Sequence, residues 1–326
     1  MQHATLLAAA ALLTACAATD PLPSWREGAV KTGIVDFVER VTDEGGPDFV
    51  PASERVATFD NDGTLWSEQP AYFQLLFAID QVRAMSSDRP EFLEEEPFRS
   101  AVEANLDGVM ASGKEGLLEL VLASHGNTST DEFAAIAREW IETARHPTTA
   151  KPYTRMVYQP MLELLDYLRA EGFDVFIVSG GGIEFLRVWA EEVYGVPPQN
   201  VIGSTIATTF EWNDGTPRLM RQPRIDFIDD GAGKPVAIHR HIGRRPIAAF
   251  GNSDGDLEML QWTAAGDGPR FMALVHHTDG DREWAYDRES PVGRLRWALD
   301  EAAEQDWTVI DMARDWETVY APARDE

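Results

Sequence analysis

The chain has only one cysteine in 326 residues, Cys16, so no disulfide can form within it. Cationic side chains are also few: 28 Lys and Arg stand against 55 Asp and Glu, which gives a formal net charge of -27. This balance argues against nucleic-acid binding, because phosphate backbones require clustered Lys and Arg. The same surface repels anions at long range, so a phosphate ester would need a local cation from a metal ion, Lys or Arg.

The sequence also lacks an apolar run at its N-terminus that is long enough to cross a bilayer as a helix. The run from Leu6 to Cys16 has the length of a signal-peptide core ahead of small residues. Residues 13–16, Leu-Thr-Ala-Cys, resemble a bacterial lipobox, in which the cysteine is lipidated after cleavage. We therefore expect residues 1–19 to be a signal peptide and the protein to be exported to the periplasm, with membrane contact only through a lipid on Cys16. An ordinary cleaved signal and a mis-chosen start codon are the alternatives.

The strongest chemical signal is the stretch 55–65, Arg-Val-Ala-Thr-Phe-Asp-Asn-Asp-Gly-Thr-Leu. It starts as a short apolar run, which predicts a buried strand, and continues as turn-forming Asp-Asn-Asp-Gly-Thr. Asp60 and Asp62 therefore follow a strand, at the edge where open parallel sheets bind ligands. Two carboxylates held together favour a divalent cation, because like charges otherwise repel each other. An EF-hand calcium loop is excluded, because its sixth and twelfth positions need Gly and Glu but are Leu65 and Ala71 here.

Three later segments also place polar residues after an apolar run or in a glycine-rich bend. Ser179 follows the apolar run 174–178 and precedes three glycines, whose backbone N–H groups are suited to holding an anion. Lys234 lies in Gly-Ala-Gly-Lys-Pro, where a compact cation neutralises carboxylates or phosphate, and the absence of Ser or Thr after it excludes a Walker loop. The segment 250–260 supplies oxygen ligands of the kind that Mg²⁺ prefers, from Asn252, Ser253, Asp254 and Asp256.

In order along the chain, these four segments resemble the motifs of the haloacid dehalogenase (HAD) superfamily of phosphohydrolases. The closest resemblance within it is to phosphoserine phosphatases with a helical cap, and it covers residues 55–260. The last segment departs from the family pattern, because Asn252 stands where the family has its first Asp. Carbon–halogen hydrolases lack an acid at the place of Asp62, so dehalogenation is not expected.

The alternation of strands and helices predicts an α/β fold with a doubly wound parallel sheet. Between the first two strands lies a long all-helical stretch, which the resemblance identifies as a cap domain inserted after the first strand. We expect helices at 32–43, 69–86, 90–109, 114–124, 130–145, 158–171 and 183–194. We expect strands at 55–60, 174–178, 201–206, 246–251 and 271–276, a hairpin from 209 to 220, and an edge strand at 307–311.

These elements divide the chain into four parts. Residues 1–19 are the expected signal peptide, and 20–50 are a tether followed by a helix, with the tether outside the fold. The core domain is expected at 51–66 and 150–326, and the helical cap at 67–149.

The resemblance implies a Mg²⁺-dependent phosphomonoester hydrolase acting on a small phosphorylated substrate. Asp60 would form an aspartyl-phosphate, and Asp62 would act as the general acid and base. Ser179, Lys234 and backbone N–H groups near Asn61 and Gly180 would hold the phosphoryl oxygens. The implied ligands of Mg²⁺ are Asp60, the backbone carbonyl of Asp62, and Asn252 or Asp256, with Asp254 as a further candidate.

The substrate is not predicted beyond a small organic phosphate. Glu68 lies near the position where phosphoserine phosphatases carry a cap Glu that binds the substrate amine. Trp66 with Tyr72 would suit a quaternary ammonium. His239 and His241, expected on one side of an extended segment, and His276 with His277 are weak candidates for a second metal. A non-catalytic HAD-fold binding lipoprotein and a phosphotransferase remain alternatives. Further candidates in the cap are Gln74, Arg83 and Lys114.

Overall fold

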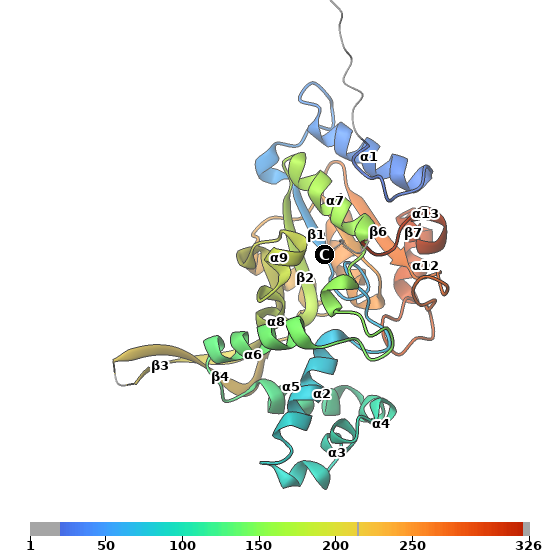
Figure 1. The fold of residues 1–326 in the computed structure, drawn as a ribbon. Coiled ribbons are helices and arrows are strands. Elements are labelled where there is room, and N and C mark those ends of the chain that lie inside the picture. Colours follow the sequence, from blue (N-terminus) through green and yellow to red (C-terminus); the bar gives the residue numbers. More distant parts are fainter. Residues whose placement is uncertain (1–19, 214, 322–326) are drawn as a thin grey trace, which may run out of the picture.

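The computed structural model describes residues 20–213 and 215–321. Seven strands form one sheet in the order β4-β3-β2-β1-β5-β6-β7, with helices on both faces (Figure 1). All neighbouring pairs are parallel except β3 with β4, which is antiparallel. The predicted α/β fold is confirmed. The strands are β1 (Val56–Phe59), β2 (Asp174–Gly182), β3 (Val201–Asn213), β4 (Thr216–Phe227), β5 (Ala248–Gly251), β6 (Phe271–His276) and β7 (Thr308–Asp311).

Alternate residues of the central strands face two separate hydrophobic cores. In β5, Ala248 and Phe250 belong to one core, and Ala249 belongs to the other. The first core is covered by α1 (Ala29–Thr42), α7 (Gln159–Ala170), α8 (Ile183–Arg187) and α9 (Ala190–Tyr194). The second is covered by α10 (Gly233–His241), α11 (Leu257–Ala264) and α12 (Trp297–Glu304). A short helix, α13 (Met312–Asp315), follows β7.

The insertion between β1 and β2 is helical, as predicted, and has a small core of its own. The single helix expected at 90–109 is instead a 3₁₀ turn (Pro90–Leu93) and two short helices. Pro97 has no N–H to donate and lies where the predicted helix would continue, and Asn105 caps a new helix by accepting a bond from the N–H of Gly108. The helices are α2 (Phe73–Met85), α3 (Phe98–Val102), α4 (Leu106–Ala111), α5 (Gly113–His125) and α6 (Thr130–Thr143).

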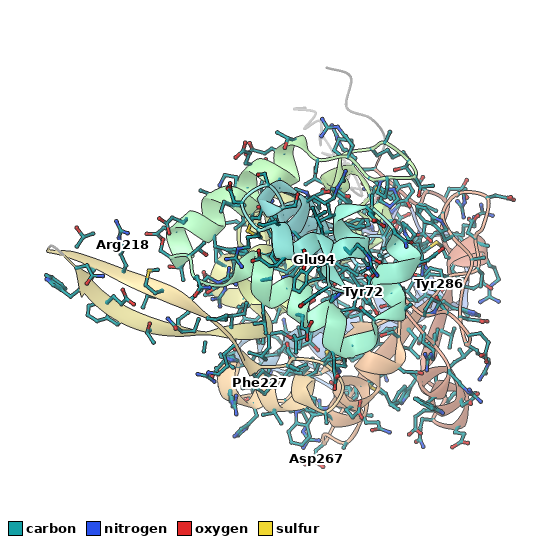
Figure 2. The ribbon with its side chains drawn as sticks, turned by 90° about the horizontal axis from the view of Figure 1, so that it is seen from below. Tyr72, Glu94, Arg218, Phe227, Asp267 and Tyr286 are labelled. Atoms are coloured by element: carbon teal, nitrogen blue, oxygen red, sulfur yellow. The ribbon has the colours of Figure 1, made fainter. Side chains whose placement is uncertain are left out.

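The predicted hairpin is present but much longer than expected, and it extends away from the body of the molecule (Figures 1 and 2). Its strand β4 is bonded to the loop between α5 and α6. The N–H of Arg221 donates to the carbonyl of Thr128 at 2.8 Å, and the N–H of Asn127 donates to the carbonyl of Arg221 at 2.9 Å. The hairpin and the helical insertion are therefore joined over the same edge of the sheet.

The expectation that residues 20–30 lie outside the fold as a tether is wrong. Leu22 and Trp25 are buried, and the Nε1 of Trp25 donates to the carbonyl of Pro160 at 2.9 Å. The indole of Trp25 also meets Trp316 edge to face. This stretch closes the first core, because its aromatic ring fills a site between α7 and the C-terminal segment. The predicted signal peptide lies outside the described residues, and within them no helix has both the length and the apolar character to cross a membrane.

Candidate active site

The loop after β1 is a tight turn that brings two acids to the carboxyl edge of the sheet. The carbonyl of Asn61 accepts from the N–H groups of Thr64 and Leu65, which reverses the chain. Gly63 has a φ of +75°, and a Cβ there would lie 2.0 Å from Asn252 Nδ2. Glycine is required for both reasons. The turn therefore lies directly against the loop after β5.

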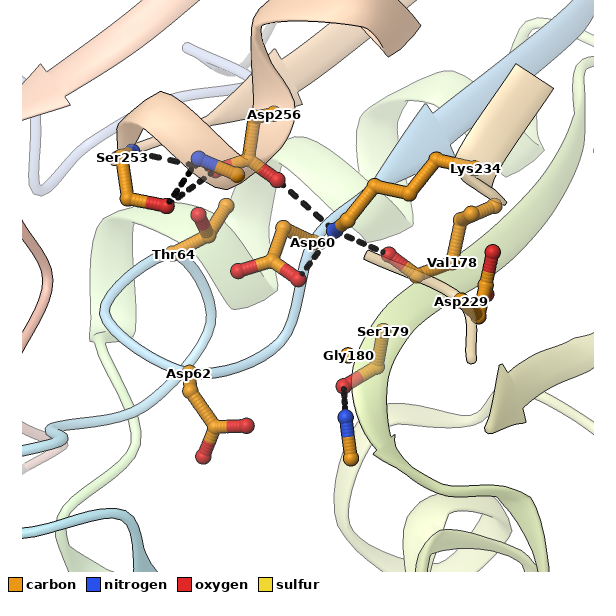
Figure 3. Close-up of polar contacts among 12 residues, drawn as sticks. Asp60, Asp62, Thr64, Val178, Ser179, Gly180, Asp229, Lys234, Ser253 and Asp256 are labelled. Carbon is orange, nitrogen blue, oxygen red and sulfur yellow. Dashed lines mark hydrogen bonds and ion pairs between the residues drawn. The ribbon is translucent and has the colours of Figure 1, made fainter. Parts of the chain in front are cut away.

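Lys234 joins the two loops through a pair of carboxylates (Figure 3). Its Nζ lies 2.6 Å from Asp60 Oδ1 and 2.7 Å from Asp256 Oδ1, and it donates to the carbonyl of Val178 at 2.7 Å. The side chain is buried. Although burial alone lowers the pKa of Lys234, the charges of Asp256 and Asp60 raise it above its usual value, so the amine stays cationic.

Asp60 and Asp62 have different surroundings. Burial and the charge of Asp256 raise the pKa of Asp60 well above its usual value, against the effect of Lys234. Asp62 accepts a hydrogen bond at 2.8 Å from Nε1 of Trp66, and burial raises its pKa to about 6. An acid with that pKa exchanges protons readily near neutral pH. Both carboxylates line the same cavity.

The end of β2 forms the opposite wall of the cavity. The Oγ of Ser179 accepts from the N–H of Gly181 at 3.0 Å, so it fixes the glycine loop. Gly180 and Gly181 line the cavity, whereas Ser179 is buried behind them. The N–H of Gly182 donates to the side chain of Gln74 in α2, which ties the helical insertion to this loop.

The two acids of the loop after β5, Asp254 and Asp256, have different hydrogen-bond partners. Asp256 Oδ2 accepts from the backbone N–H groups of Asn252 and Ser253, each at 3.0 Å. Asp254 Oδ1 accepts from three N–H groups at the start of α12, including that of Trp297 at 2.7 Å. Asp254 thus caps a helix through Oδ1, and it does not line the cavity that holds Asp60 and Asp62.

Glu68 lies beside Asn252 rather than among the residues of the insertion. Its Oε1 accepts from Nδ2 of Asn252 at 2.7 Å and from the hydroxyl of Tyr286 at 2.8 Å. Burial raises the pKa of Glu68 well above its usual value. Thr64 Oγ1 donates to the amide oxygen of Asn252 at 3.1 Å, so both ends of that amide are fixed.

Trp66 does not line the cavity, so the prediction of a quaternary ammonium site on its ring is wrong. Its ring stacks on Trp189 at 4.3 Å and meets Phe73 at 4.7 Å, so its faces are covered by other side chains. Asn61 also points into the core, where its Oδ1 accepts from the hydroxyl of Tyr194 at 3.0 Å. The side chains of both residues position the turn from behind.

Residues of the loop after β6 support the turn, and no sequence pattern predicted this role. His277 Nε2 lies 2.8 Å from the carbonyl of Gly63, and its Nδ1 lies 3.2 Å from Oε2 of Glu283. Tyr158 donates to the other oxygen of Glu283 at 2.8 Å. This buried series of contacts supports the Asp60–Gly63 turn.

The predicted second metal site is not supported by the described histidines. His239 and His241 lie in helix α10 and not in an extended segment. His277 is bonded to a backbone carbonyl and to Glu283, as described above, and His276 lies 3.5 Å from Asp287. Arg83, a candidate ligand-binding residue of the cap, lies 3.6 Å from Asp80 on the outside of α2.

Asp229 is a buried acid that sequence patterns did not single out. Neither carboxylate oxygen has a hydrogen-bond partner within the part of the chain that the structure describes. Burial raises the pKa of Asp229 to about 7, although Lys234 lowers it. It lies near Lys234 in the close-up (Figure 3).

The oxygens around Asp60 fit a hard divalent cation. Two carboxylates, those of Asp60 and Asp256, pair with the amine of Lys234, and that of Asp62 lines the same cavity. Across the described residues, no three His, Cys, Asp or Glu side chains are grouped as a metal site. A Mg²⁺ ion would therefore take Asp60, a backbone carbonyl of the turn, the amide oxygen of Asn252, and water, a ligand set typical of this ion.

Acids and a buried lysine lie together at the carboxyl edge of a mostly parallel α/β sheet. This combination is typical of a class of hydrolases. A family model of haloacid dehalogenase-like hydrolases matches residues 57–261, and the chain belongs to this family. No curated protein matches the chain.

The chain is similar to several solved structures. A conserved protein of unknown function from Anaerococcus prevotii DSM 20548 is similar at a TM-score of 0.57 and 15% identity, covering 91% of this chain and 97% of that one. A protein of unknown function from Bordetella pertussis Tohama I has a TM-score of 0.49 and 17% identity, covering 79% and 99%. A phosphoserine phosphohydrolase-like protein from Francisella tularensis has a TM-score of 0.39 and 16% identity, covering 77% and 99%. At this identity the first of these supports the fold alone.

Proposed function

We propose that the protein is a Mg²⁺-dependent phosphomonoesterase that works through an aspartyl-phosphate on Asp60. The observation that carries the proposal is the contact of Lys234 with both Asp60 and Asp256, at 2.6 and 2.7 Å. Asp62, two residues after Asp60, lines the same cavity. One carboxylate beside a fixed cation and a second one free to exchange a proton are what a two-step displacement on phosphorus needs.

The steps follow from the positions of the groups. Asp60 attacks phosphorus and displaces the alcohol, and Asp62 donates its proton to the leaving oxygen. Asp62 then takes a proton from the water that attacks the phosphoryl group, which restores Asp60. Lys234 and the backbone N–H groups near Asn61 and Gly180 stabilise the charge on the phosphoryl oxygens.

Asp60, the backbone carbonyl of Asp62 and the amide oxygen of Asn252 would hold the metal. When bound, Mg²⁺ supplies positive charge that offsets the repulsion between the phosphate and Asp60. We infer that Asn252 is the direct ligand and Asp256 is not, because both oxygens of Asp256 already bind Lys234 and the loop backbone. Glu68 accepts from the amide nitrogen of Asn252, which directs the amide oxygen away from Glu68.

Two further parts of the proposal concern the rest of the chain. The helical segment 67–149 acts as a cap, an assignment supported by the bond between Gln74 and the glycine loop. Residues 1–19 direct export to the periplasm, with Cys16 as the site of lipidation, on the strength of their apolar composition and the lipobox-like sequence.

The test is release of inorganic phosphate from an aryl phosphate, with Mg²⁺ and with a chelator. We expect metal-dependent turnover that is lost in Asp60→Asn, with Asp254→Asn as the matched control because that acid caps α12 outside the chemistry. Turnover that is equal in Asp60→Asn and wild type would contradict the proposal. Transfer of phosphate to an added alcohol in place of water would favour the phosphotransferase alternative, and tight binding without turnover would favour a binding protein.

A further inference from the structure

The cavity that holds Asp60 and Asp62 also has a wall of apolar side chains. Its volume is about 300 Å³, at the lower limit for small-molecule sites. The outer walls are built by the hairpin and by helices α5, α6 and α8. Their cavity-lining side chains include Leu118, Val121, Phe133, Phe185, Ile206 and Ile225.

Two ion pairs also line the cavity, Lys114 with Asp230 at 3.9 Å and Arg221 with Glu184, and the second lies beside Phe133. Nε of Arg221, in β4, lies 2.6 Å from Oε2 of Glu184, in α8. The guanidinium of Arg221 also lies 3.6 Å from the centre of the Phe133 ring, and only 3% of its side chain is exposed. A quarter of the Glu184 side chain is exposed, and this residue lines the cavity.

The two members of this pair therefore have different roles. Arg221 is held on both sides, by Glu184 and by Phe133, so it is a fixed partner with little freedom to reach a ligand. Glu184 is anchored through one oxygen, and its carboxylate borders the space where a ligand would lie. A carboxylate in this position accepts hydrogen bonds and repels anions.

We propose that the substrates are phosphate monoesters of alcohols with an apolar, aromatic body and a hydrogen-bond donor at the end far from the phosphate, and that Glu184 accepts from that donor. This inference rests on the proposed phosphatase function. The phosphate would lie between Lys234 and the glycine loop, and the body would lie among the side chains of α5, α6 and the hairpin.

Small, highly polar esters are poor substrates by the same argument. The carboxylate and ammonium of phosphoserine would lose water against Leu118, Val121 and Ile225, and Lys114, a cation at this cavity, already lies 3.9 Å from Asp230. The carboxylate would also approach Glu184. We expect an apolar body to raise kcat/KM by roughly 10- to 100-fold over a polar body of similar length.

The experiment uses the full chain and four matched esters: phenethyl phosphate, its para-hydroxy and para-methoxy derivatives, and glycerol phosphate. The para-hydroxy ester carries a donor at its far end, and the para-methoxy ester keeps the oxygen but replaces the donor hydrogen by a methyl group. We expect the highest kcat/KM for the para-hydroxy ester and the lowest for glycerol phosphate. The double variant Glu184→Leu with Arg221→Met replaces the buried pair by apolar side chains, so that neither charge is left alone.

The expected effect of the double variant is a fall of about tenfold in the kcat/KM ratio of the para-hydroxy to the para-methoxy ester. Arg240→Met is the control, because Arg240 lies over the ring of Phe227 at 4.7 Å and does not line the cavity. This variant keeps the wild-type ratio. Thermal unfolding of each variant verifies that it is folded.

Binding of the alcohols without phosphate, measured by calorimetry, separates the two proposals. The para-hydroxy alcohol should bind with a negative heat-capacity change and more tightly than glycerol. If the alcohols bind in this order and no ester is hydrolysed, the phosphatase proposal fails and the assignment of the pocket stands. Turnover with a preference for glycerol phosphate, or an unchanged ratio in the double variant, overturns the assignment of the pocket.

Discussion

Asp60 and Asp62 are two positions apart, yet their carboxylates have different neighbours. Asp60 is bonded to Lys234, and Asp62 to the indole N–H of Trp66. The first contact holds a nucleophile in place beside a cation. The second fixes the direction of an acid whose pKa is raised to about 6 by burial. The division of roles between the two acids follows from these contacts.

Replacing Trp66 by Phe should lower kcat without unfolding the protein. The ring packing is largely kept, but the hydrogen bond to Asp62 is lost, which costs roughly 1.5 kcal/mol, or about tenfold in rate. Steady-state kinetics with an aryl phosphate measure the change. Trp189→Phe is the control, since Nε1 of Trp189 has no hydrogen-bond partner in the described chain. Equal rates in the two variants would show that the indole N–H does not orient Asp62.

Asp229→Asn should change the pH dependence of stability. The pKa of Asp229 is raised from 3.8 to about 7 in the folded state, so the folded protein holds a proton that the unfolded chain releases. The resulting stability is complete below about pH 4 and is lost as the pH rises through about 7. The variant does not lose stability in this way, because an asparagine side chain does not release a proton in this pH range.

Urea unfolding at about pH 5 and about pH 8 measures the effect. The unfolding free energy of the variant minus that of wild type should be roughly 2 to 4 kcal/mol more positive at the higher pH than at the lower pH. A difference between variant and wild type that is the same at both pH values would mean that Asp229 does not titrate in this range.

At the scale of elements, the central strands and their polar ends were predictable. The runs that became β1, β2 and β5 are apolar and short, and each is followed by residues that do not continue a strand. The sequence therefore placed Asp60, Ser179 and Asn252 near one another. Parallel topology then brings the carboxyl ends of neighbouring strands to one edge of the sheet.

Features that depend on distant contacts were not predictable. The support of the turn by His277 and Glu283 joins segments more than 200 residues apart in the chain. The role of Trp66 could not be inferred either, because a buried aromatic and a ligand-binding aromatic have the same sequence pattern. The length of the hairpin was missed because its outer half has no alternation of apolar and polar residues that a buried face would impose.

The outer half of the hairpin carries an exposed aromatic pair. Phe210 and Trp212 are each 64% exposed, and they lie opposite Leu219 and Pro217 on the other strand. Their double replacement by Thr should change the free energy of unfolding by about 0.5 kcal/mol or less, because they bury little area. Phe133→Ala, in the buried part beneath the hairpin, should cost roughly 3 to 5 kcal/mol. Chemical denaturation compares the two, and a large loss in the Thr variant would mean that the tip is packed in solution.

At the scale of the whole molecule, the described N-terminal segment and the C-terminal segment close the fold together. The N–H of Arg26 donates to the carbonyl of Asp315 at 2.8 Å, and the N–H of Glu317 donates to that of Ser24 at 2.8 Å. Trp25 packs between them against Trp316. The two ends of the described chain therefore stabilise the first core jointly.

Trp25→Ala should destabilise the protein by roughly 3 to 5 kcal/mol, because it removes a large ring from a closed site. Trp297→Ala is the matched control, since Trp297 is 58% exposed and should cost little. The free energy of unfolding in urea measures both. A small effect at Trp25 would restore the view that this stretch is a tether.

The most direct test of the account is to trap the covalent intermediate in Asp62→Asn. An aryl phosphate has a good leaving group and needs little protonation, so Asp60 should still be phosphorylated in this variant. Hydrolysis of the aspartyl-phosphate needs a general base and should be slow. After acid quench, mass spectrometry of the peptide that contains residue 60 should find the mass of one added phosphoryl group on Asp60. A phosphoryl group on another residue, or Asp62→Asn protein that turns over aryl phosphate at the wild-type rate without a phosphorylated peptide, would contradict the account.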